Sequence, residues 1–202
     1  MTSKRFYYAP MHKRFYKSSR YNMYKSILEN IPYDFKPDLI MSISDDERGG
    51  GPIVDHFKNS QIHDARFPEY DICNLWNVED NTYECIVCDQ VLEHVKNPFN
   101  AVNEMRRVLK PEGLLFLTTV FMYPIHSHPS DYWRFTPDAL ELLCEDFSEI
   151  VICDGWGNSD IVKIITDQRE KKLGIPKVEE VSDLMEINNP ESPLTTWIIA
   201  EK

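Results

Sequence analysis

The stretch Asp80-Asn-Thr-Tyr-Glu-Cys-Ile-Val-Cys-Asp-Gln-Val-Leu-Glu-His-Val-Lys-Asn-Pro98 decides the fold. Residues 84–88 have the apolar, β-rich character of a buried strand, and residues 89–94 form a polar turn. Residues 98–109 follow as an amphipathic helix. The side chains predicted on its buried face are Phe99, Val102, Met105, Val108 and Leu109. Pro111-Glu-Gly113 ends this helix, and the run at 114–120 reads as a strand buried on both faces of a sheet.

Strands and helices alternate along the rest of the chain. Helices are predicted at residues 16–30, 53–57 and 137–144, and strands at residues 38–44, 61–64, 70–73, 150–153 and 195–200. A loop is predicted at residues 45–52, and a polar insertion or flap at residues 155–193. This alternation is typical of an α/β fold with a doubly wound, mostly parallel sheet. Ligands of such sheets bind at the carboxyl ends of the strands, which points to the loops after residues 44, 64, 73, 88 and 120.

Length and composition limit the classes of protein. With 202 residues, we expect one domain over residues 1–202, in which residues 1–30 form a basic, aromatic leader and helix. We find no apolar run of about 20 residues and no secretory signal at the start, so we expect a cytoplasmic protein without membrane contact. The net charge is −11, yet residues 1–29 hold seven Lys or Arg and one acid. We expect this leader to pack on the acidic body or to contact an anionic small molecule, in preference to nucleic acid.

The five cysteines are expected to be buried apolar residues. Cys85 and Cys88 are three residues apart in a predicted strand, so their side chains should point to opposite faces of the sheet. A metal or redox pair needs both thiols on one side. We therefore predict no zinc or redox centre here.

The segment from Asp80 to Pro98, followed by Glu104-Met-Arg-Arg-Val-Leu-Lys-Pro-Glu-Gly113, resembles class I S-adenosylmethionine-dependent methyltransferases of the UbiE/type-11 kind. The run His126-Ser-His-Pro-Ser-Asp-Tyr-Trp-Arg-Phe-Thr136 is similar to a subgroup associated with surface-glycan and other small-molecule pathways. The resemblance implies a Rossmann-like, seven-stranded, mostly parallel sheet with a reversed C-terminal hairpin. It also implies S-adenosylmethionine as cofactor and O-methylation of a small molecule, such as a sugar or a phosphorylated metabolite of a surface-glycan pathway.

The resemblance also implies which residues hold the cofactor. They are Ser44, Gly49, Gly50, Gly51, Asp64, Asp71, Ile72, Asp89 and Gln90. Glycine allows the backbone to approach a ligand closely, and a carboxylate can accept hydrogen bonds from both ribose hydroxyls. The chain departs from the family at Ser42-Ile-Ser-Asp-Asp-Glu-Arg-Gly-Gly-Gly51, where charged residues displace the glycines from the end of the strand. This departure leaves open an alternative function, in which the protein is a noncatalytic, methyltransferase-like binding or regulatory subunit.

The acceptor is expected to lie beside the segment after residue 120. His126 is the first candidate for a base that removes a hydroxyl proton, followed by His128 and His94. The residues expected to bind the acceptor are Tyr123, Asp131, Tyr132 and Arg134. Two structural alternatives stay open: a local backbone hydrogen bond for His94, and a loop-closing knot made by Asp131, Tyr132 and Arg134.

Two further functions are disfavoured by the sequence. A metal on His126, His128 and Asp131 lacks a fourth ligand with recognisable spacing, so no metal is predicted. A nucleic-acid methyltransferase is the least favoured hypothesis, because we find no motif of the Asn-Pro-Pro-Tyr type for methylation of base amino groups. The oligomeric state is left undetermined.

Overall fold

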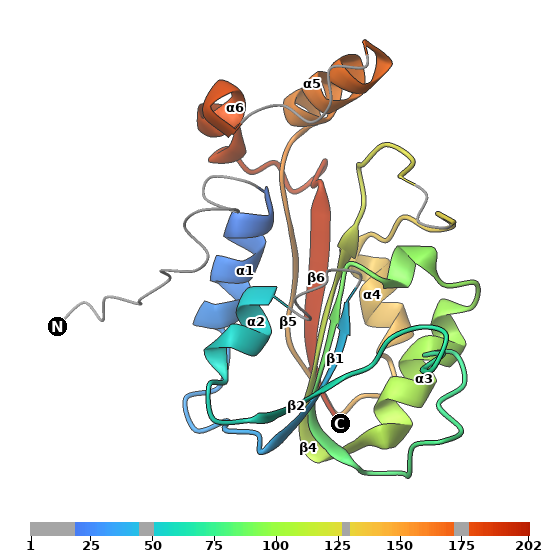
Figure 1. Cartoon of the computed structure of the whole chain (residues 1–202). Coiled ribbons are helices and arrows are strands. Elements are labelled where there is room, and N and C mark those ends of the chain that lie inside the picture. The colour runs from blue at the N-terminus through green and yellow to red at the C-terminus, as the bar shows by residue number, and fades with distance from the viewer. Residues whose placement is uncertain (1–18, 45–50, 127–129, 172–177) are drawn as a thin grey trace, which may run out of the picture.

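The computed structural model describes residues 19–44, 51–126, 130–171 and 178–202. Helices cover both faces of a central sheet (Figure 1). The helices are α1 (Ser19–Glu29), α2 (Gly51–His56), α3 (Pro98–Val108), α4 (Pro137–Leu143), α5 (Ser159–Glu170), α6 (Val178–Met185) and a short 3₁₀ helix at Leu92–His94. The strands are β1 (Leu39–Ser44), β2 (Gln61–Asp64), β3 (Tyr83–Asp89), β4 (Leu109–Val120), β5 (Glu149–Trp156) and β6 (Thr195–Glu201).

The sheet has the strand order β2-β1-β3-β4-β6-β5. The first four strands are parallel, whereas β6 is antiparallel to both β4 and β5. This confirms the predicted α/β fold with a mostly parallel sheet and a reversed C-terminal hairpin. The long apolar runs of β3 and β4 are explained by this order, because both strands lie inside the sheet and are covered on both faces.

The predicted count of seven strands is wrong for the described residues, which form six. The segment predicted as a strand at residues 70–73 is a turn. The carboxylate of Asp71 accepts a hydrogen bond from the backbone N–H of Cys73, 2.9 Å away, which bends the chain locally. Ile72 still points inward and is buried in the core, so its apolar character reflects packing rather than a strand.

Two hydrophobic cores hold the helices to the sheet. One joins α1 and α2 to one face of the sheet, and the other joins α3 and α4 to the opposite face (Figure 1). Phe99 was predicted on the buried face of α3, but it is 52% exposed. The buried face of α3 is formed by Pro98, Ala101, Val102, Met105 and Val108. Phe99 follows Pro98 directly, and one residue turns the side chain by about 100° around the helix.

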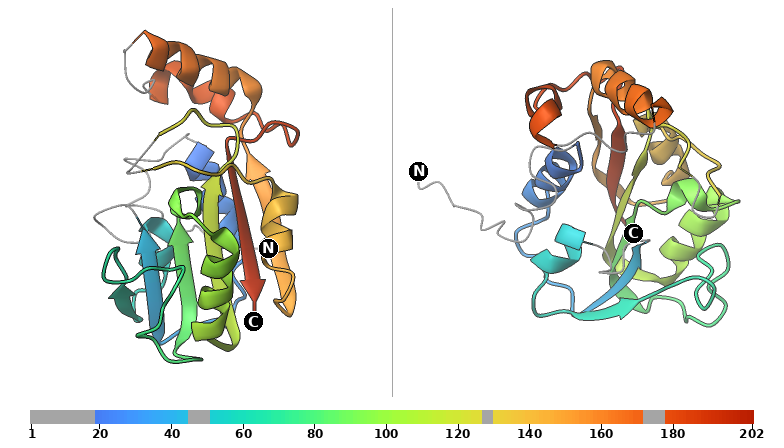
Figure 2. Two further views of the ribbon diagram at one scale, coloured as in Figure 1. Left: turned by 90° about the vertical axis from the view of Figure 1, so that its right-hand side faces the viewer. Right: turned by 45° about the horizontal axis from the view of Figure 1, so that its top comes forward.

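Residues 155–193 contain the two helices α5 and α6, where the sequence indicated a polar insertion or flap. Asn158 caps α5 by accepting hydrogen bonds from the backbone N–H groups of Asp160 and Ile161. A small core between α5 and α6, centred on Ile161 and Val181, holds the two together. Both helices lie beyond the end of the sheet toward which the parallel strands point (Figure 2). Within the described part of the chain, no helix is long and apolar enough to cross a membrane.

The cysteines are free thiols, and the two of the CxxC pattern lie on opposite faces of β3 as predicted. The expectation that all five are buried holds for Cys85, Cys88 and Cys144 and is wrong for Cys73 and Cys153, which are half-buried. Cys85 packs in the core under α1, and Cys88 in the core under α3. Burial raises the pKa of Cys144 to about 12 and has the same effect on Cys153. Because the thiolate is the nucleophile, both thiols should be almost unreactive in the folded protein.

We therefore expect iodoacetamide at pH 8 to alkylate Cys144 and Cys153 far more slowly in the folded chain than in urea. Peptide mass spectrometry at several times measures both rates. Equal rates with and without urea would contradict the raised pKa of these buried and half-buried thiols.

Candidate functional site

Three neighbouring strands bring polar residues into one row at their carboxyl ends. Ser44 of β1 pairs with Asp89 of β3, and Asp89 pairs with Thr118 of β4. At the edge of the sheet, Asp64 ends β2 opposite Ser42. The register therefore places three residues predicted to bind a cofactor, Ser44, Asp64 and Asp89, along the same end of the sheet.

The carboxylate of Asp89 lies at the centre of this row and is almost fully buried. Its Oδ2 accepts a hydrogen bond from the Tyr24 hydroxyl at 2.7 Å, and its Oδ1 accepts one from Thr118 Oγ1 at 2.6 Å. Burial raises the pKa of Asp89, and Arg20, Thr118 and Tyr24 each oppose this shift. The side chain thus bonds across the sheet to α1 and β4, rather than capping the helix that follows it.

Gly51 begins α2 beside Asp89. It has φ +53°, and a Cβ built on it would lie 3.6 Å from Asp89 Oδ2 and from the Tyr24 hydroxyl. A glycine at this place lets the backbone turn into α2 close to the buried carboxylate. Gly49 and Gly50, predicted to act together with Gly51, lie outside the described residues.

Gln90 follows Asp89 in a left-handed conformation with φ 58°. Its amide Nε2 donates to Thr118 Oγ1 at 3.0 Å, and its Oε1 accepts from Arg20 Nη2 at 3.4 Å. Burial lowers the pKa of Arg20, but Tyr24, Asp89, Glu93 and Tyr123 raise it overall, so the guanidinium stays cationic. Neither Arg20 nor Tyr24 was predicted as a site residue from the sequence. Their spacing of four residues puts both side chains on one face of a helix, which was the available signal.

Two of the remaining predicted cofactor residues are at the surface and one is in the core. Asp64 forms an ion pair with Arg66 at 2.7 Å, and its side chain is 39% exposed. Asp71 is exposed and Ile72 is buried.

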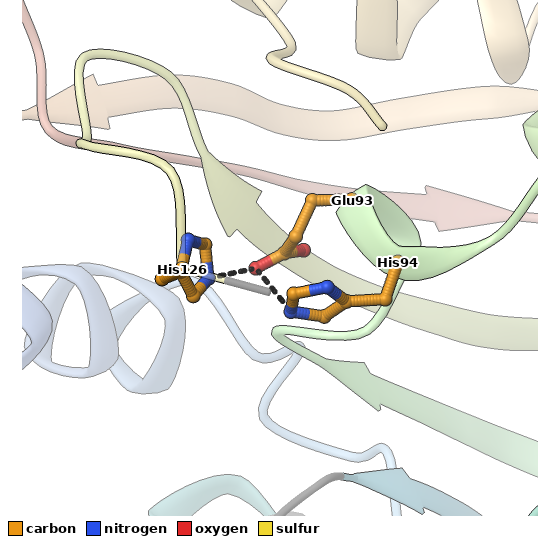
Figure 3. Close-up of side chains that lie close together, drawn as sticks. All are labelled: Glu93, His94 and His126. Atoms are coloured by element: carbon orange, nitrogen blue, oxygen red, sulfur yellow. Dashed lines mark ion pairs between the residues drawn. The ribbon is translucent and has the colours of Figure 1, made fainter. Parts of the chain in front are cut away.

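A second polar group lies beyond Gln90, where Glu93, His94 and His126 point toward one another (Figure 3). We call these three residues the histidine cluster. Glu93 and His94 belong to the 3₁₀ helix after β3, and His126 belongs to the segment after β4. Glu93 Oε1 lies 3.6 Å from His126 Nε2 and 3.9 Å from His94 Nε2. The two imidazole rings are 4.9 Å apart between centroids.

Glu93 is fully buried. It was not predicted as a site residue from the sequence. Its Oε2 accepts a hydrogen bond from Thr119 Oγ1 at 2.8 Å, whereas Oε1 has no hydrogen-bond donor among the described residues. Its backbone carbonyl accepts from the N–H groups of Tyr132 and Trp133, which ties the later loop to the 3₁₀ helix. A carboxylate between Leu92 and His94 in the Leu-Glu-His turn was the signal for its role.

The loop after β4 holds His126 through Asp131 and Arg134. Arg134 donates two hydrogen bonds to the Asp131 carboxylate, at 2.5 and 2.7 Å, and these lower the pKa of Asp131 well below its usual range. Asp131 Oδ2 accepts from the backbone N–H of His126 at 2.8 Å, and lies 3.2 Å from its Nδ1. Arg134 also donates to the carbonyl of Tyr123 at 3.0 Å. These contacts support the loop-closing knot left open by the sequence.

The other residues predicted on the acceptor side surround this knot. The ring of Tyr123 packs edge-on against His126, with centroids 5.2 Å apart. Tyr132 is 46% exposed. His94 Nδ1 lies 2.5 Å from the backbone carbonyl of Ser130, so its local backbone contact is present beside its place in the cluster. His128, the remaining histidine candidate, lies outside the described residues.

A family model described as a methyltransferase domain matches residues 53–117. The chain is 30% identical over 127 residues to the human mitochondrial ubiquinone biosynthesis O-methyltransferase, covering 50% of this chain and 34% of that protein. It is 29% identical over 65 residues to the ubiquinone biosynthesis O-methyltransferase of Haemophilus ducreyi, covering 32% of this chain and 25% of that protein. The matches thus span about a quarter to a third of these relatives.

Solved structures share the fold over most of the chain. A SAM-dependent methyltransferase from Archaeoglobus fulgidus superposes with a TM-score of 0.56 at 16% identity, covering 98% of this chain and 100% of that one. The phosphoethanolamine N-methyltransferase 2 of Haemonchus contortus in complex with S-adenosyl-L-methionine gives 0.59 at 14% identity, covering 96% and 56%. The chain therefore has the Rossmann-like fold of class I methyltransferases, and its residues 53–117 carry the sequence pattern of a methyltransferase domain.

Proposed function

We propose that the protein is an S-adenosylmethionine-dependent methyltransferase that transfers a methyl group to a small-molecule acceptor. The observation that carries this proposal is the adjacency of two polar groups at the carboxyl ends of the strands. One is the buried network of Asp89 and Gln90, and the other is the histidine cluster after it. Ligands of open α/β sheets bind at this end. The methyltransferase match covers β3 and the turn after it, which together carry Asp89, Gln90, Glu93 and His94.

The donor half of the proposed site runs along the strand ends from β2 to β3. Asp64 would accept hydrogen bonds from the ribose hydroxyls, and Asp71 with Ile72 would face the adenine. Asp89 and Gln90, held by Tyr24 and Arg20, would orient the methionine portion together with Ser44 and the glycines at 49–51. A network that is fixed before the ligand arrives needs little reorganisation on binding.

The acceptor half is the histidine cluster with its loop. Methyl transfer from a sulfonium is an in-line displacement, so the protein chiefly has to align acceptor, methyl group and sulfur. A hydroxyl acceptor must also lose its proton as the new bond forms, and His126 and His94 are the proposed groups that take it. Such assistance contributes about 10²–10⁴-fold to a rate. Tyr123 and Tyr132 would contact the acceptor, and Asp131 with Arg134 would hold the loop.

For the acceptor, we propose a hydroxyl of a small molecule, which is in line with the O-methyltransferase names of the relatives. A sugar or a phosphorylated metabolite is the proposed kind. The basic residues at 1–29 favour an anionic acceptor.

Replacing Asp64 by alanine is expected to weaken S-adenosylmethionine binding at least tenfold. The variant would lose hydrogen bonds from ribose hydroxyls to a charged acceptor, each contributing about 1.5–3 kcal/mol. Isothermal titration of the full chain measures the change. Asp167→Ala is the matched control, because Asp167 is an exposed acid of α5 that pairs with Lys171. Equal affinities of the two variants would remove Asp64 from the donor site.

A further inference from the structure

We propose that the histidine cluster is a binding site for one divalent transition-metal ion, with Glu93, His94 and His126 as its protein ligands. This inference rests on the acceptor half of the proposed function and changes one step of it: because a metal-bound imidazole nitrogen cannot also take a proton, His126 and His94 would hold the metal instead of acting as bases. It starts from the atoms that Figure 3 shows facing one another, one carboxylate oxygen and two imidazole nitrogens. One ligand atom from each residue lies within 4.8 Å of the other two.

The hydrogen bonds around the cluster determine where the imidazole protons sit. His94 Nδ1 lies 2.5 Å from the carbonyl oxygen of Ser130, and a carbonyl only accepts, so this nitrogen carries the proton. His126 Nδ1 lies 3.2 Å from Asp131 Oδ2, a carboxylate that Arg134 holds with two hydrogen bonds. The charge of that carboxylate favours the proton of His126 on Nδ1. An imidazole that carries its single proton on Nδ1 presents a lone pair at Nε2.

Both lone pairs face Glu93 Oε1. This oxygen belongs to a fully buried side chain and has no hydrogen-bond donor among the described residues. Three acceptors that converge without a donor repel one another, and a buried polar atom without a hydrogen-bond partner destabilises the fold. A cation between them converts this repulsion into attraction.

The distances suit a metal ion. Bonds of about 2.1 Å to nitrogen and oxygen place neighbouring ligand atoms of a tetrahedral ion about 3.4 Å apart. Glu93 Oε1 is 3.6 Å from His126 Nε2 and 3.9 Å from His94 Nε2, so small side-chain shifts bring all three into range. Two imidazoles and one carboxylate are a donor set for zinc or another first-row transition ion, rather than for Mg²⁺ or Ca²⁺.

The surroundings of His94, and in part those of His126, resemble those of metal-bound imidazoles. A ligating histidine usually donates its other ring N–H to a carbonyl or a carboxylate, which fixes the ring. Ser130 supplies the carbonyl for His94. For His126, the Asp131 carboxylate lies 3.2 Å from Nδ1 without the geometry of a hydrogen bond, so this carboxylate acts on the ring through its charge. Three protein ligands leave a coordination position open, and an acceptor hydroxyl bound there would lose its proton more easily.

The test is a titration of the full chain with Co²⁺, followed by its visible absorption spectrum and by equilibrium dialysis. We expect about one Co²⁺ per chain, bound without a thiolate charge-transfer band, and displaced by Zn²⁺ but not by an equal amount of Mg²⁺. Glu93→Gln and His126→Gln should each weaken binding at least tenfold. Asp131→Asn should weaken it by about 10–100-fold, because it loosens His126.

His56→Gln is the matched control, since His56 lies on α2 and is exposed. Circular dichroism checks that each variant is folded, and His126→Gln serves if the buried Glu93 does not tolerate substitution. The proposal would be overturned if the folded chain bound no Co²⁺, or if neither Glu93→Gln nor His126→Gln weakened the binding. A proton shared between the three side chains would then be the cation of the cluster.

A parallel titration with S-adenosylmethionine separates this result from the proposed function. Metal binding without donor binding would refute the methyltransferase and keep the metal site. Donor binding without metal binding would refute the metal site alone.

Discussion

Replacing Asp89 by alanine is expected to lower the free energy of unfolding by about 3–5 kcal/mol, the cost of breaking a buried charged network from one side. The change removes the acceptor of the Tyr24 and Thr118 hydroxyls, which lie 2.7 and 2.6 Å from its two carboxylate oxygens. It also removes a carboxylate whose charge acts on the guanidinium of Arg20. Urea unfolding followed by circular dichroism measures the difference.

Asp89→Asn is the control that separates shape from charge. Asparagine keeps the volume and one side-chain oxygen, so it can still accept a hydrogen bond from one of the two hydroxyls. We expect its loss of stability to be smaller than that of Asp89→Ala. A loss below about 1 kcal/mol for Asp89→Ala, in the range of surface substitutions, would show that the network contributes little to folding.

Replacing Gly157 by alanine is expected to destabilise the protein by about 2–5 kcal/mol, the sum of backbone strain and overpacking. Gly157 has φ +136°, and an added Cβ would lie 2.6 Å from both the backbone nitrogen and the Cδ1 atom of Leu194. The backbone nitrogen cannot move without disturbing its hydrogen bond to the carbonyl of Trp156. The same urea measurement applies.

Gly51→Ala is the matched control, because Gly51 also has a positive φ but its added Cβ would meet no atom closer than 3.6 Å. It should therefore show the backbone strain alone, about 1–2 kcal/mol. Equal losses for the two variants would mean that the close approach of Leu194 to Gly157 has no energetic consequence.

The sequence predicted those parts of the fold that local periodicity determines. The strand Gln61–Asp64 was predicted with the bounds observed, and β3 and the helix after it within one or two residues. The segment at residues 70–73 was mistaken for a strand, because Ile72 is buried through a turn rather than through the sheet. The helices α5 and α6 were missed because the polar composition of residues 155–193 outweighed the apolar side chains that join them, such as Ile161 and Ile165.

At the candidate site, the sequence indicated residues that follow strands but missed those that distant segments bring to them. Asp89 and Gln90 stand at the end of β3, where a strand pattern alone suggests a ligand. Tyr24 reaches Asp89 from 65 residues away, and Glu93 faces His126 from another loop. Neither pairing has a local pattern, because it depends on how α1 and the segment after β4 pack on the sheet. The roles of all these residues in binding and catalysis stay predictions.

The most direct test of the proposed methyltransferase is an isothermal titration of the full chain with S-adenosylmethionine and with its demethylated product. We expect binding of one molecule per chain with a micromolar dissociation constant, which corresponds to about −8 kcal/mol. The absence of binding by a folded chain would contradict the proposed enzyme. It would then favour a noncatalytic methyltransferase-like subunit, in which the charged residues that displace the glycines from the end of β1 have ended donor binding.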